Sequence, residues 1–311
     1  MSTLPEDLRA ARGRFSVELS PAHEPDTARR QWAAVRALEA LGPVFASVTY
    51  GAGGGSRDGT VDLAGRLARE TTVRPLAHVT AVGQSAGELR ELLDDLAGAG
   101  VHDVLALRGD PDGDPAAPWV PHPRGLQHAD ELVRLARAHG ATCVAVAAFP
   151  LGHPDSPDLD ADTRHLLGKL RAGADLAVAQ LSLDVGDFLR LRDRLAAALA
   201  ADGLDPVPLL PGVLPLTSPK VLDVAARLTG APAPEWLRRR LGPLVDDPTA
   251  FREEGLRLAL ESGRRLLDEG VEVLHLYSLN RARAVTELVT ELGLAGGPSV
   301  ADPAADRLPT R

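Results

Sequence analysis

The sequence is poor in cysteine, lysine and aromatic residues. Cys143 is the only cysteine among 311 residues, which excludes an internal disulfide and a cysteine-rich zinc site. Lysine occurs only at Lys169 and Lys220, against 32 arginines, so any lysine chemistry has two candidates. Ten aromatic residues are few for a protein that holds a flat cofactor between rings.

The chain also lacks long apolar runs and an excess of positive charge. No apolar run reaches the roughly 18 residues that span a bilayer, and the mean hydropathy is −0.05. The first 16 residues carry Glu6 and Asp7 among arginines, which argues against a secretory signal. A net charge of −9 and a pI near 5.5 argue against a nucleic-acid partner. We therefore expect a soluble, cytoplasmic, globular protein without a membrane segment.

Short β-branched or apolar runs alternate with longer segments of helical periodicity. Eight runs have the composition of buried strands: Phe15–Ser20, Val44–Tyr50, Arg74–Thr80, Asp103–Gly109, Cys143–Phe149, Leu176–Leu183, Val207–Pro215 and Val271–Leu279. Eight amphipathic segments lie between them: Pro25–Leu41, Thr60–Arg69, Gly87–Leu96, His128–Ala138, Ala161–Arg171, Val185–Ala201, Ser218–Leu228 and Thr249–Glu269. Glycines such as Gly203 and Gly270 stand where helices should end.

This alternation favours a parallel sheet with right-handed crossovers. Eight β/α units in about 280 residues are typical of a closed (β/α)8 TIM barrel, an α/β fold, and we expect a single barrel domain over residues 14–295. Residues 1–13 would form an N-terminal extension and residues 296–311 a disordered tail. An open doubly wound sheet is the alternative, but the glycine run Gly51–Gly55 lacks the G-x-G-x-x-G spacing of a dinucleotide fold.

Polar residues gather where the predicted strands end, and in a barrel these positions carry the chemistry. The strand ends hold Glu18, Thr49, His78, Arg108 with Gly109 and Asp110, Phe149 with His153, Gln180, and Tyr277 with Arg281. Packing alone does not explain so many polar groups at one end of a barrel. We therefore expect a catalytic or binding site there.

Glu18 is the most informative of these residues, because it lies inside the apolar strand Phe15–Ser20 on the same face as Ser16. A carboxylate in that setting is costly unless it is paired or protonated. One interpretation is a general acid that keeps its proton because it is buried. The other is a carboxylate at a strand end that pairs with an arginine. The sequence does not decide between them.

Other candidates are less specific. Gly109 would let a ligand approach the backbone between Arg108 and Asp110, although Gly109–Gly113 is also rich in turn residues. His78 has no second histidine at metal-binding spacing, so we expect a hydrogen-bonding histidine and no metal site. Lys169 is interpreted as a solvent-exposed lysine unless its helix covers the mouth of the barrel.

Several short strings occur together in a familiar order. They are Phe15-Ser-Val-Glu18, Ser47-Val-Thr-Tyr-Gly-Ala52, Ala77-His-Val-Thr80, Leu107-Arg-Gly-Asp110, Ala147-Ala-Phe-Pro150 with His153-Pro154, Ala172-Gly-Ala174 after Lys169, Gln180, Pro211-Gly-Val-Leu-Pro215 and Leu279-Asn-Arg281. In this series the sequence resembles the bacterial methylenetetrahydrofolate reductases over roughly residues 14–294. No single string is diagnostic, but the whole series in register is highly specific.

The resemblance implies a (β/α)8 flavoprotein in which NADH or NADPH reduces FAD. The reduced flavin then delivers hydride to 5,10-methylenetetrahydrofolate and forms 5-methyltetrahydrofolate for methionine synthesis, with both substrates using one face of the flavin in turn. An acid is needed because the imidazolidine ring must open to an iminium before hydride reaches it. The resemblance also allows a homo-oligomer, and it does not distinguish NADH from NADPH.

The resemblance also assigns roles to individual residues. Glu18 matches the family's acid. Asp110 matches a residue that sits between flavin and folate, tunes the flavin electrostatically and holds the pterin. Gln180 matches a folate-contacting residue, and Tyr277 and Arg281 are expected beside it. Residues at flavin-contacting positions are Thr49, His78, Arg108, Gly109, Asp110, His128, Phe149, His153, Asp162 and Lys169.

The sequence departs from the family pattern mainly at aromatic positions. Leu181–Asp184 replaces an aromatic run after Gln180, Pro219 stands where a stacking aromatic is expected, and His128 replaces a tyrosine on the adenosine side. These changes remove stacking surface. Two alternatives therefore remain open: a flavin-free relative that passes hydride directly from NAD(P)H to folate or another imine, and a non-catalytic barrel that binds folate or flavin.

Overall fold

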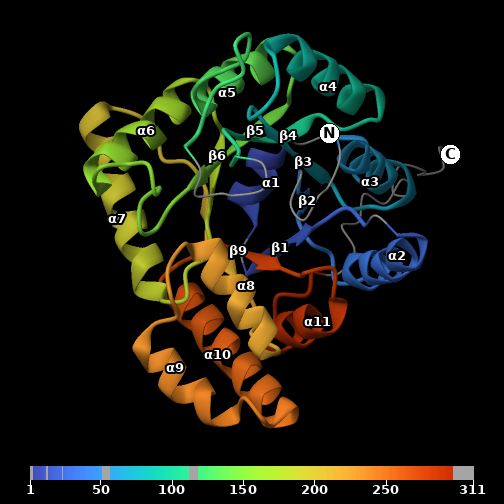
Figure 1. The fold of residues 1–311 in the computed structure, drawn as a ribbon, viewed down its shortest axis with the longest axis vertical. Coiled ribbons are helices and arrows are strands. Elements are labelled where there is room, and N and C mark those ends of the chain that lie inside the picture. Colours follow the sequence, from blue (N-terminus) through green and yellow to red (C-terminus); the bar gives the residue numbers. More distant parts are fainter. Residues whose placement is uncertain (1–2, 12, 23, 51–56, 112–117, 297–311) are drawn as a thin grey trace, which may run out of the picture.

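The computed structural model describes residues 3–11, 13–22, 24–50, 57–111 and 118–296, and these form a barrel of parallel strands surrounded by helices (Figure 1). The strands are β1 (Arg14–Leu19), β2 (Ala46–Val48), β3 (Pro75–Thr80), β4 (Asp103–Leu107), β5 (Cys143–Ala148), β6 (Leu176–Ala179), β7 (Leu209–Leu210), β8 (Gly212–Val213) and β9 (Val273–Tyr277). Their order in the sheet is β7-β6-β5-β4-β3-β2-β1-β9-β8. The predicted (β/α)8 fold is confirmed.

The seventh predicted strand, Val207–Pro215, is shorter than expected and is split in two. β7 pairs with β6, and β8 pairs with β9, so the two pieces close the barrel from opposite sides. Pro211 separates them, because proline has no N–H to donate to a ladder. Its carbonyl oxygen still accepts a hydrogen bond of 2.9 Å from His275 N on β9.

The helices are more numerous than the amphipathic segments predicted. They are α1 (Leu4–Ala10), α2 (Pro25–Glu39), α3 (Arg57–Glu70), α4 (Ala86–Gly98), α5 (Ala129–Ala138), α6 (Leu159–Arg171), α7 (Val185–Asp202), α8 (Pro219–Thr229), α9 (Glu235–Leu241), α10 (Pro248–Asp268) and α11 (Ala282–Glu291). α2 to α7, α10 and α11 surround the strands (Figure 1). The sequence reading missed α1, α9 and α11.

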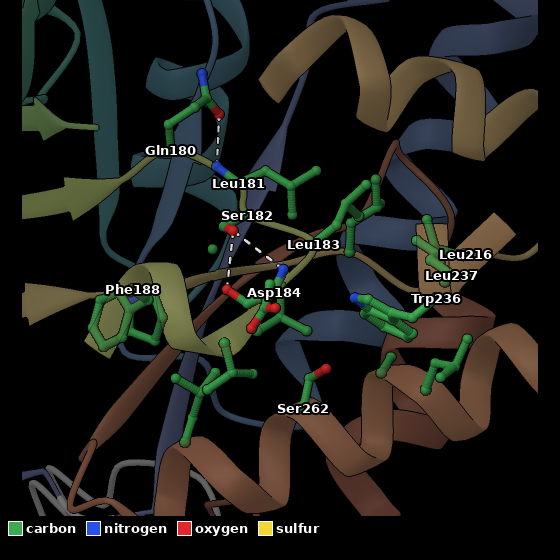
Figure 2. A pocket seen from close by; sticks show the side chains of 18 residues that line it. Gln180, Leu181, Ser182, Leu183, Asp184, Phe188, Leu216, Trp236, Leu237 and Ser262 are labelled. Carbon is green, nitrogen blue, oxygen red and sulfur yellow. Dashed lines mark hydrogen bonds between the residues drawn. The ribbon is translucent and has the colours of Figure 1, made fainter. Parts of the chain in front are cut away.

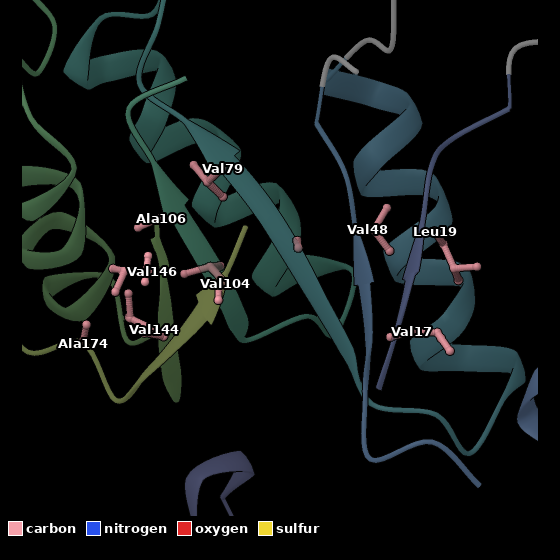
Figure 3. Packing of buried hydrophobic residues seen from close by; sticks show 14 of the residues in the cluster. Val17, Leu19, Val48, Val79, Val104, Ala106, Val144, Val146 and Ala174 are labelled. Carbon is pink, nitrogen blue, oxygen red and sulfur yellow. The ribbon is translucent and has the colours of Figure 1, made fainter. Parts of the chain in front are cut away.

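Strand alternation decides which side chains face the barrel interior. Val17 and Leu19 of β1 belong to the buried cluster between the strands and the surrounding helices, together with Val48 and Val79 (Figure 3). Successive side chains point to opposite faces of a strand, so Glu18, between Val17 and Leu19, faces inward. The same rule turns the polar side chains of β2, β3 and β9 toward Glu18.

α1 belongs to the N-terminal extension predicted for residues 1–13, and it closes one end of the barrel. Leu4 and Leu8 are buried against residues from the first halves of several strands, among them Leu76 and Cys143. The polar strand ends lie at the opposite end. The apolar residues that close one end of the barrel are therefore distinct from the polar residues at the other end.

α8 and α9 form an insertion between the seventh strand and α10. Leu237 of α9 and Phe251 of α10 are fully or almost fully buried in a separate apolar cluster that also contains Leu181 and Tyr277. This cluster connects the insertion to the strand ends. The predicted helix Ser218–Leu228 thus corresponds to α8 and lies outside the ring around the strands.

Two segments singled out in the sequence lie wholly or mostly outside the described residues. The glycine run Gly51–Gly55 and the predicted tail, apart from Gly296, lie outside the described residues. Among the residues that are described, no helix combines the length and apolar character needed to cross a membrane.

Candidate active site

Two histidines face the Glu18 carboxylate at the end of β1. Glu18 Oε2 lies 3.9 Å from His78 Nε2 on β3 and 3.9 Å from His275 Nε2 on β9. The Glu18 side chain is 20% exposed, so a ligand can reach it. No arginine or lysine of the described ranges pairs with it, which removes the interpretation of an arginine-paired carboxylate for that part of the chain.

His275 is a buried polar residue that the sequence reading did not single out. Its Nδ1 hydrogen-bonds the hydroxyl of Ser16 at 2.8 Å, and its Nε2 lies 3.4 Å from the hydroxyl of Ser47. Alternation in β9 already places His275 on the same face as Tyr277. That signal could have identified it, but a histidine between two leucines also fits an ordinary core position.

Burial keeps His78 neutral. Desolvation lowers the pKa of His78 to about 4, and the nearby charge of Glu18 only partly opposes this effect. The Nε2 atom of His78 has no hydrogen-bond partner among the described residues, although it is buried. A buried nitrogen of this kind is costly to leave unpaired, so it is suited to contact a bound ligand.

Gln180 and Tyr277 are joined across the barrel mouth. The Tyr277 hydroxyl donates to Gln180 Oε1 at 3.1 Å, and Leu181 N donates to the same oxygen at 2.9 Å. Burial is the main cause that raises the pKa of Tyr277 well above its usual value, and the charge of Glu18 adds to it. The phenol therefore stays protonated and holds the Gln180 amide in one orientation.

A second group of predicted residues surrounds the end of β4. Arg108 Nη2 pairs with Asp155 at 2.6 Å, and its guanidinium lies 4.9 Å from the centre of the Trp119 ring. The rings of Phe149 and His153 meet edge to face at 4.8 Å. Burial, followed by the charge of Arg108, lowers the pKa of His153.

Gly109 allows the backbone to turn between Arg108 and the exposed Asp110. Its φ is +83°, and a Cβ there would lie 2.6 Å from a methyl group of Val82. Any other residue would therefore be strained and would clash. The close approach expected from the sequence at this position is present.

Lys169 and Asp162 both lie on α6 and form hydrogen bonds with β5 and the loop that follows it. The ammonium of Lys169 donates to Ala147 O at 2.5 Å, and burial lowers the pKa of Lys169 to about 8. Asp162 Oδ1 accepts from His153 N at 2.9 Å and from the Ser156 hydroxyl at 3.2 Å. The interpretation of Lys169 as a solvent-exposed lysine is wrong, because α6 turns it toward the strand ends.

Three predicted residues are less closely joined to these groups. Thr49 is buried at the end of β2, and its hydroxyl has no partner among the described residues. His128 is exposed as the residue before α5, with no side-chain capping bond. Arg281 is exposed as the residue before α11 and lines a cavity beside Tyr277.

A mainly apolar pocket of about 50 Å³ lies between the β6–α7 loop and α9–α10 (Figure 2). Gln180 is the predicted site residue that lines it. The Ser182 hydroxyl in this pocket is engaged by Asp184 and Asp187. Figure 2 shows Trp236 on the far side of the pocket from Gln180. The pocket therefore offers apolar surface next to Gln180 and few free polar groups.

Comparison of the sequence with known proteins identifies the family. A profile of the family described as methylenetetrahydrofolate reductase matches residues 4–293. A 5,10-methylenetetrahydrofolate reductase of Pectobacterium carotovorum is 33% identical over 293 residues, which cover 94% of each chain. The protein of the same name from Escherichia coli K12 is 31% identical over 296 residues, covering 94% of this chain and 96% of the other.

A solved structure supports the fold. An uncharacterized protein from Clostridium thermocellum, which binds two copies of 5-methyl-5,6,7,8-tetrahydrofolic acid, superposes with a TM-score of 0.66. It covers 93% of this chain and 97% of its own, at 11% sequence identity. The predicted family is confirmed by the sequence matches: this chain belongs to the methylenetetrahydrofolate reductases, a family of oxidoreductases.

Proposed function

We propose that the protein reduces 5,10-methylenetetrahydrofolate to 5-methyltetrahydrofolate with NADH or NADPH through bound FAD, and that Glu18 is the general acid. The observation that carries this proposal is the setting of Glu18. It is a largely buried carboxylate at the end of β1, between two imidazoles and without a cationic partner among the described residues. The choice of 5,10-methylenetetrahydrofolate as substrate rests on membership of the family.

Glu18 is suited to give a proton to a ring nitrogen of the folate. Protonation opens the imidazolidine ring and leaves an iminium carbon that accepts hydride. Because His78 is neutral above a pH of about 4, that imidazole places no positive charge beside the carboxyl group. An arginine at that distance would favour the carboxylate and oppose proton donation.

Gln180, Tyr277, Asp110 and Arg281 would bind the folate. The Gln180 amide oxygen is already occupied by two donors, so its NH2 group is left to donate to an acceptor on the heterocycle. Asp110, exposed beside Gly109, can accept hydrogen bonds from the pterin. Arg281 offers a guanidinium to a carboxylate of the substrate.

The residues present fit FAD. The unpartnered buried atoms Thr49 Oγ1, His78 Nε2 and Thr80 Oγ1 lie on neighbouring strands, where a polar ring would complete their hydrogen bonds. Gly109 leaves the backbone open to close approach. Arg108 and Lys169 supply positive charge for a phosphate, and His128, Phe149, His153 and Asp162 would complete the site. When bound, FAD would take hydride from NAD(P)H and pass it to the folate.

An absorption spectrum of the purified protein tests the proposal. We expect a yellow protein whose flavin band is bleached by NADH or NADPH under anaerobic conditions and restored by 5,10-methylenetetrahydrofolate. A colourless protein that FAD does not saturate would contradict the flavin. Oxidation of NADH by folate in that colourless protein would then indicate direct hydride transfer, and the lack of it a binding protein.

A further inference from the structure

A buried polar group lies beneath Glu18, deeper in the barrel. His275 of β9 is 1% exposed, and the side chains of Ser16 and Ser47 are buried with it. Strand pairing places Ser16 of β1 opposite His275 and Ser47 of β2 opposite Glu18. Bulk solvent does not reach the His275 ring, so its nitrogen atoms have to find their partners inside the protein.

Packing fixes the plane of the His275 ring. Phe45 stacks on it, with 5.7 Å between the ring centres and 18° between the planes. Tyr277 meets it edge to face at 5.7 Å. Since the ring cannot turn without displacing these two neighbours, the positions of Nδ1 and Nε2 are set by the fold.

Ser16 decides which ring nitrogen carries the proton. Its hydroxyl lies 2.8 Å from His275 Nδ1, whereas the Ser47 hydroxyl lies 3.4 Å from Nε2, at the limit of a hydrogen bond. The Ser16 side chain makes no other hydrogen bond among the described residues, so its hydroxyl donates to Nδ1. The opposite arrangement would leave a buried donor unpaired, which is costly. A neutral His275 therefore carries its proton on Nε2.

We propose that His275 is a positioning residue whose Nε2–H stabilises the carboxylate that Glu18 becomes when it gives its proton to the folate. This inference rests on the proposed function. In that step the O–H bond of Glu18 breaks, the proton passes to a ring nitrogen of the folate, and the electron pair stays on the carboxyl oxygen. A hydrogen bond to a charged oxygen is stronger than one to a neutral acid, so the stabilisation grows as the proton leaves.

The distance suits a bond that forms during the reaction. His275 Nε2 lies 3.9 Å from Glu18 Oε2, and a small rotation of the Glu18 side chain brings them together. Catalytic hydrogen bonds are often long before the substrate binds.

The two imidazoles beside Glu18 thus have different roles. His78 Nε2 lies at the same distance but has no partner among the described residues, and it is assigned to the flavin. His275 is buried below Glu18, so it acts on the folate only through that carboxyl group. A third titratable group near Glu18, Tyr277 of β9, stays protonated because burial raises its pKa.

The test compares His275→Asn with His275→Gln. Asparagine keeps a polar atom near the position of Nδ1 but does not reach Glu18, whereas glutamine can place an NH2 donor near the position of Nε2. We expect the reoxidation of reduced flavin by 5,10-methylenetetrahydrofolate to slow about tenfold in His275→Asn and to stay within about threefold of native in His275→Gln. Flavin reduction by NADH should be close to native in both, and stopped-flow absorbance measures each step.

The pH profile separates this role from a merely structural one. Folate reduction needs protonated Glu18, so its rate falls on the alkaline side. In His275→Asn this fall should move about one pH unit higher, because the carboxylate loses a donor that stabilised it. His102→Asn is the matched control, since His102 is exposed and precedes β4 at the closed end of the barrel.

Two kinetic results would overturn the inference: a native rate and pH profile in His275→Asn, or an equal loss in both variants. If His275→Asn does not fold, Ser16→Ala serves, because it removes only the hydroxyl that selects the tautomer. It should shift the profile in the same direction, and an unshifted profile would count against the inference.

A measurement without turnover keeps this inference distinct from the proposed function. In protein labelled with 15N-histidine, the His275 signals, assigned by their loss in His275→Gln, show which nitrogen is protonated. We expect the proton on Nε2, and a proton on Nδ1 would overturn the inference. If the native protein reduces no folate, the proposed function fails, while the spectrum still tests the tautomer.

Discussion

At the scale of single residues, the proposed chemistry depends on side chains that face the barrel interior without a full set of partners. Glu18 faces two imidazoles, and buried polar atoms of Thr49, His78 and Thr80 have no hydrogen-bond partner in the described ranges. Folded proteins rarely leave such atoms unpaired. Their gathering at one end of the barrel therefore supports the ligand site proposed there.

Replacement of Glu18 by glutamine should separate the two halves of the reaction. Glutamine keeps the size of the side chain but has no proton to donate as an acid, so folate reduction should fall by about 100- to 10,000-fold. Flavin reduction by NADH should stay within a few-fold of native. Stopped-flow absorbance of each half-reaction measures both rates. Native folate turnover in Glu18→Gln would disprove the assignment of the acid.

The affinity for FAD should fall as the pH rises through the pKa of Lys169. That pKa is about 8, so the side chain is mostly charged at pH 7 and mostly neutral at pH 9. If the ammonium attracts a phosphate, the dissociation constant should increase about tenfold over this interval, since one charge is lost. Flavin fluorescence titration gives the constants.

Lys169→Met is the control for this effect. It should bind FAD more weakly at pH 7, and its affinity should vary less between pH 7 and 9. A pH-independent affinity in the native protein would show that Lys169 does not take part in binding.

At the scale of elements, loops and helix packing fix where the strand ends point. Leu279 and Asn280 follow β9 with φ of +47° and +57°. The Asn280 side chain accepts from Ser20 N at 3.0 Å and donates to Ser20 O at 2.8 Å. This pair of bonds ties the end of β9 to the end of β1, and so keeps Tyr277 and Glu18 side by side.

α10 approaches the segment after β8 closely enough to require a glycine. A Cβ at Gly255 would lie 1.8 Å from the carbonyl oxygen of Leu216, a backbone atom that cannot turn away. Gly255→Ala should destabilise the protein by about 1–3 kcal/mol, because overpacking forces the backbone to shift. Urea unfolding followed by circular dichroism measures the loss.

Gly168→Ala in α6 provides the contrast. A Cβ there meets no atom within 4 Å, so the substitution should stabilise the helix by about 0.5–1 kcal/mol. Equal stability of the two variants would contradict the proposed close packing of α10.

At the scale of the whole molecule, the two ends of the barrel are built from different kinds of residue. α1 closes one end with Leu4 and Leu8, while the polar strand ends occupy the other. Buried apolar groups stabilise the fold wherever they lie, whereas the proposed site admits its substrate at the polar end. Stability and turnover should therefore respond independently to substitutions at the closed end.

Leu8→Ala tests this separation. Leu8 is 2% exposed, and removing its side chain should cost about 2–5 kcal/mol of unfolding free energy. The turnover number of the folded variant should stay within about twofold of native, and Arg9→Ala, exposed on the same helix, should change stability by less than about 0.5 kcal/mol. A loss of turnover as large as that of Glu18→Gln would show that the two ends are coupled.

The order of strands and helices, the barrel and the polar strand ends could be predicted from the amino-acid pattern, because apolar periodicity and alternation are local properties. Its account of the helices was less complete. α1 and α9 are too short for a clear period, and α11 follows its strand after only a few residues. Lys169 shows the same limit, since its burial follows from neighbours far away in the chain.

The partners of the predicted residues follow from the folded arrangement and could not be read from the sequence. Folding placed two histidines beside Glu18, brought the Ser16–His275 pair beneath it, and gathered Arg252 and Arg283 around Glu287. Such distances depend on the register between strands and on the packing of helices that are far apart in sequence. A one-dimensional pattern shows which face a residue takes, but closure of the barrel decides what lies opposite.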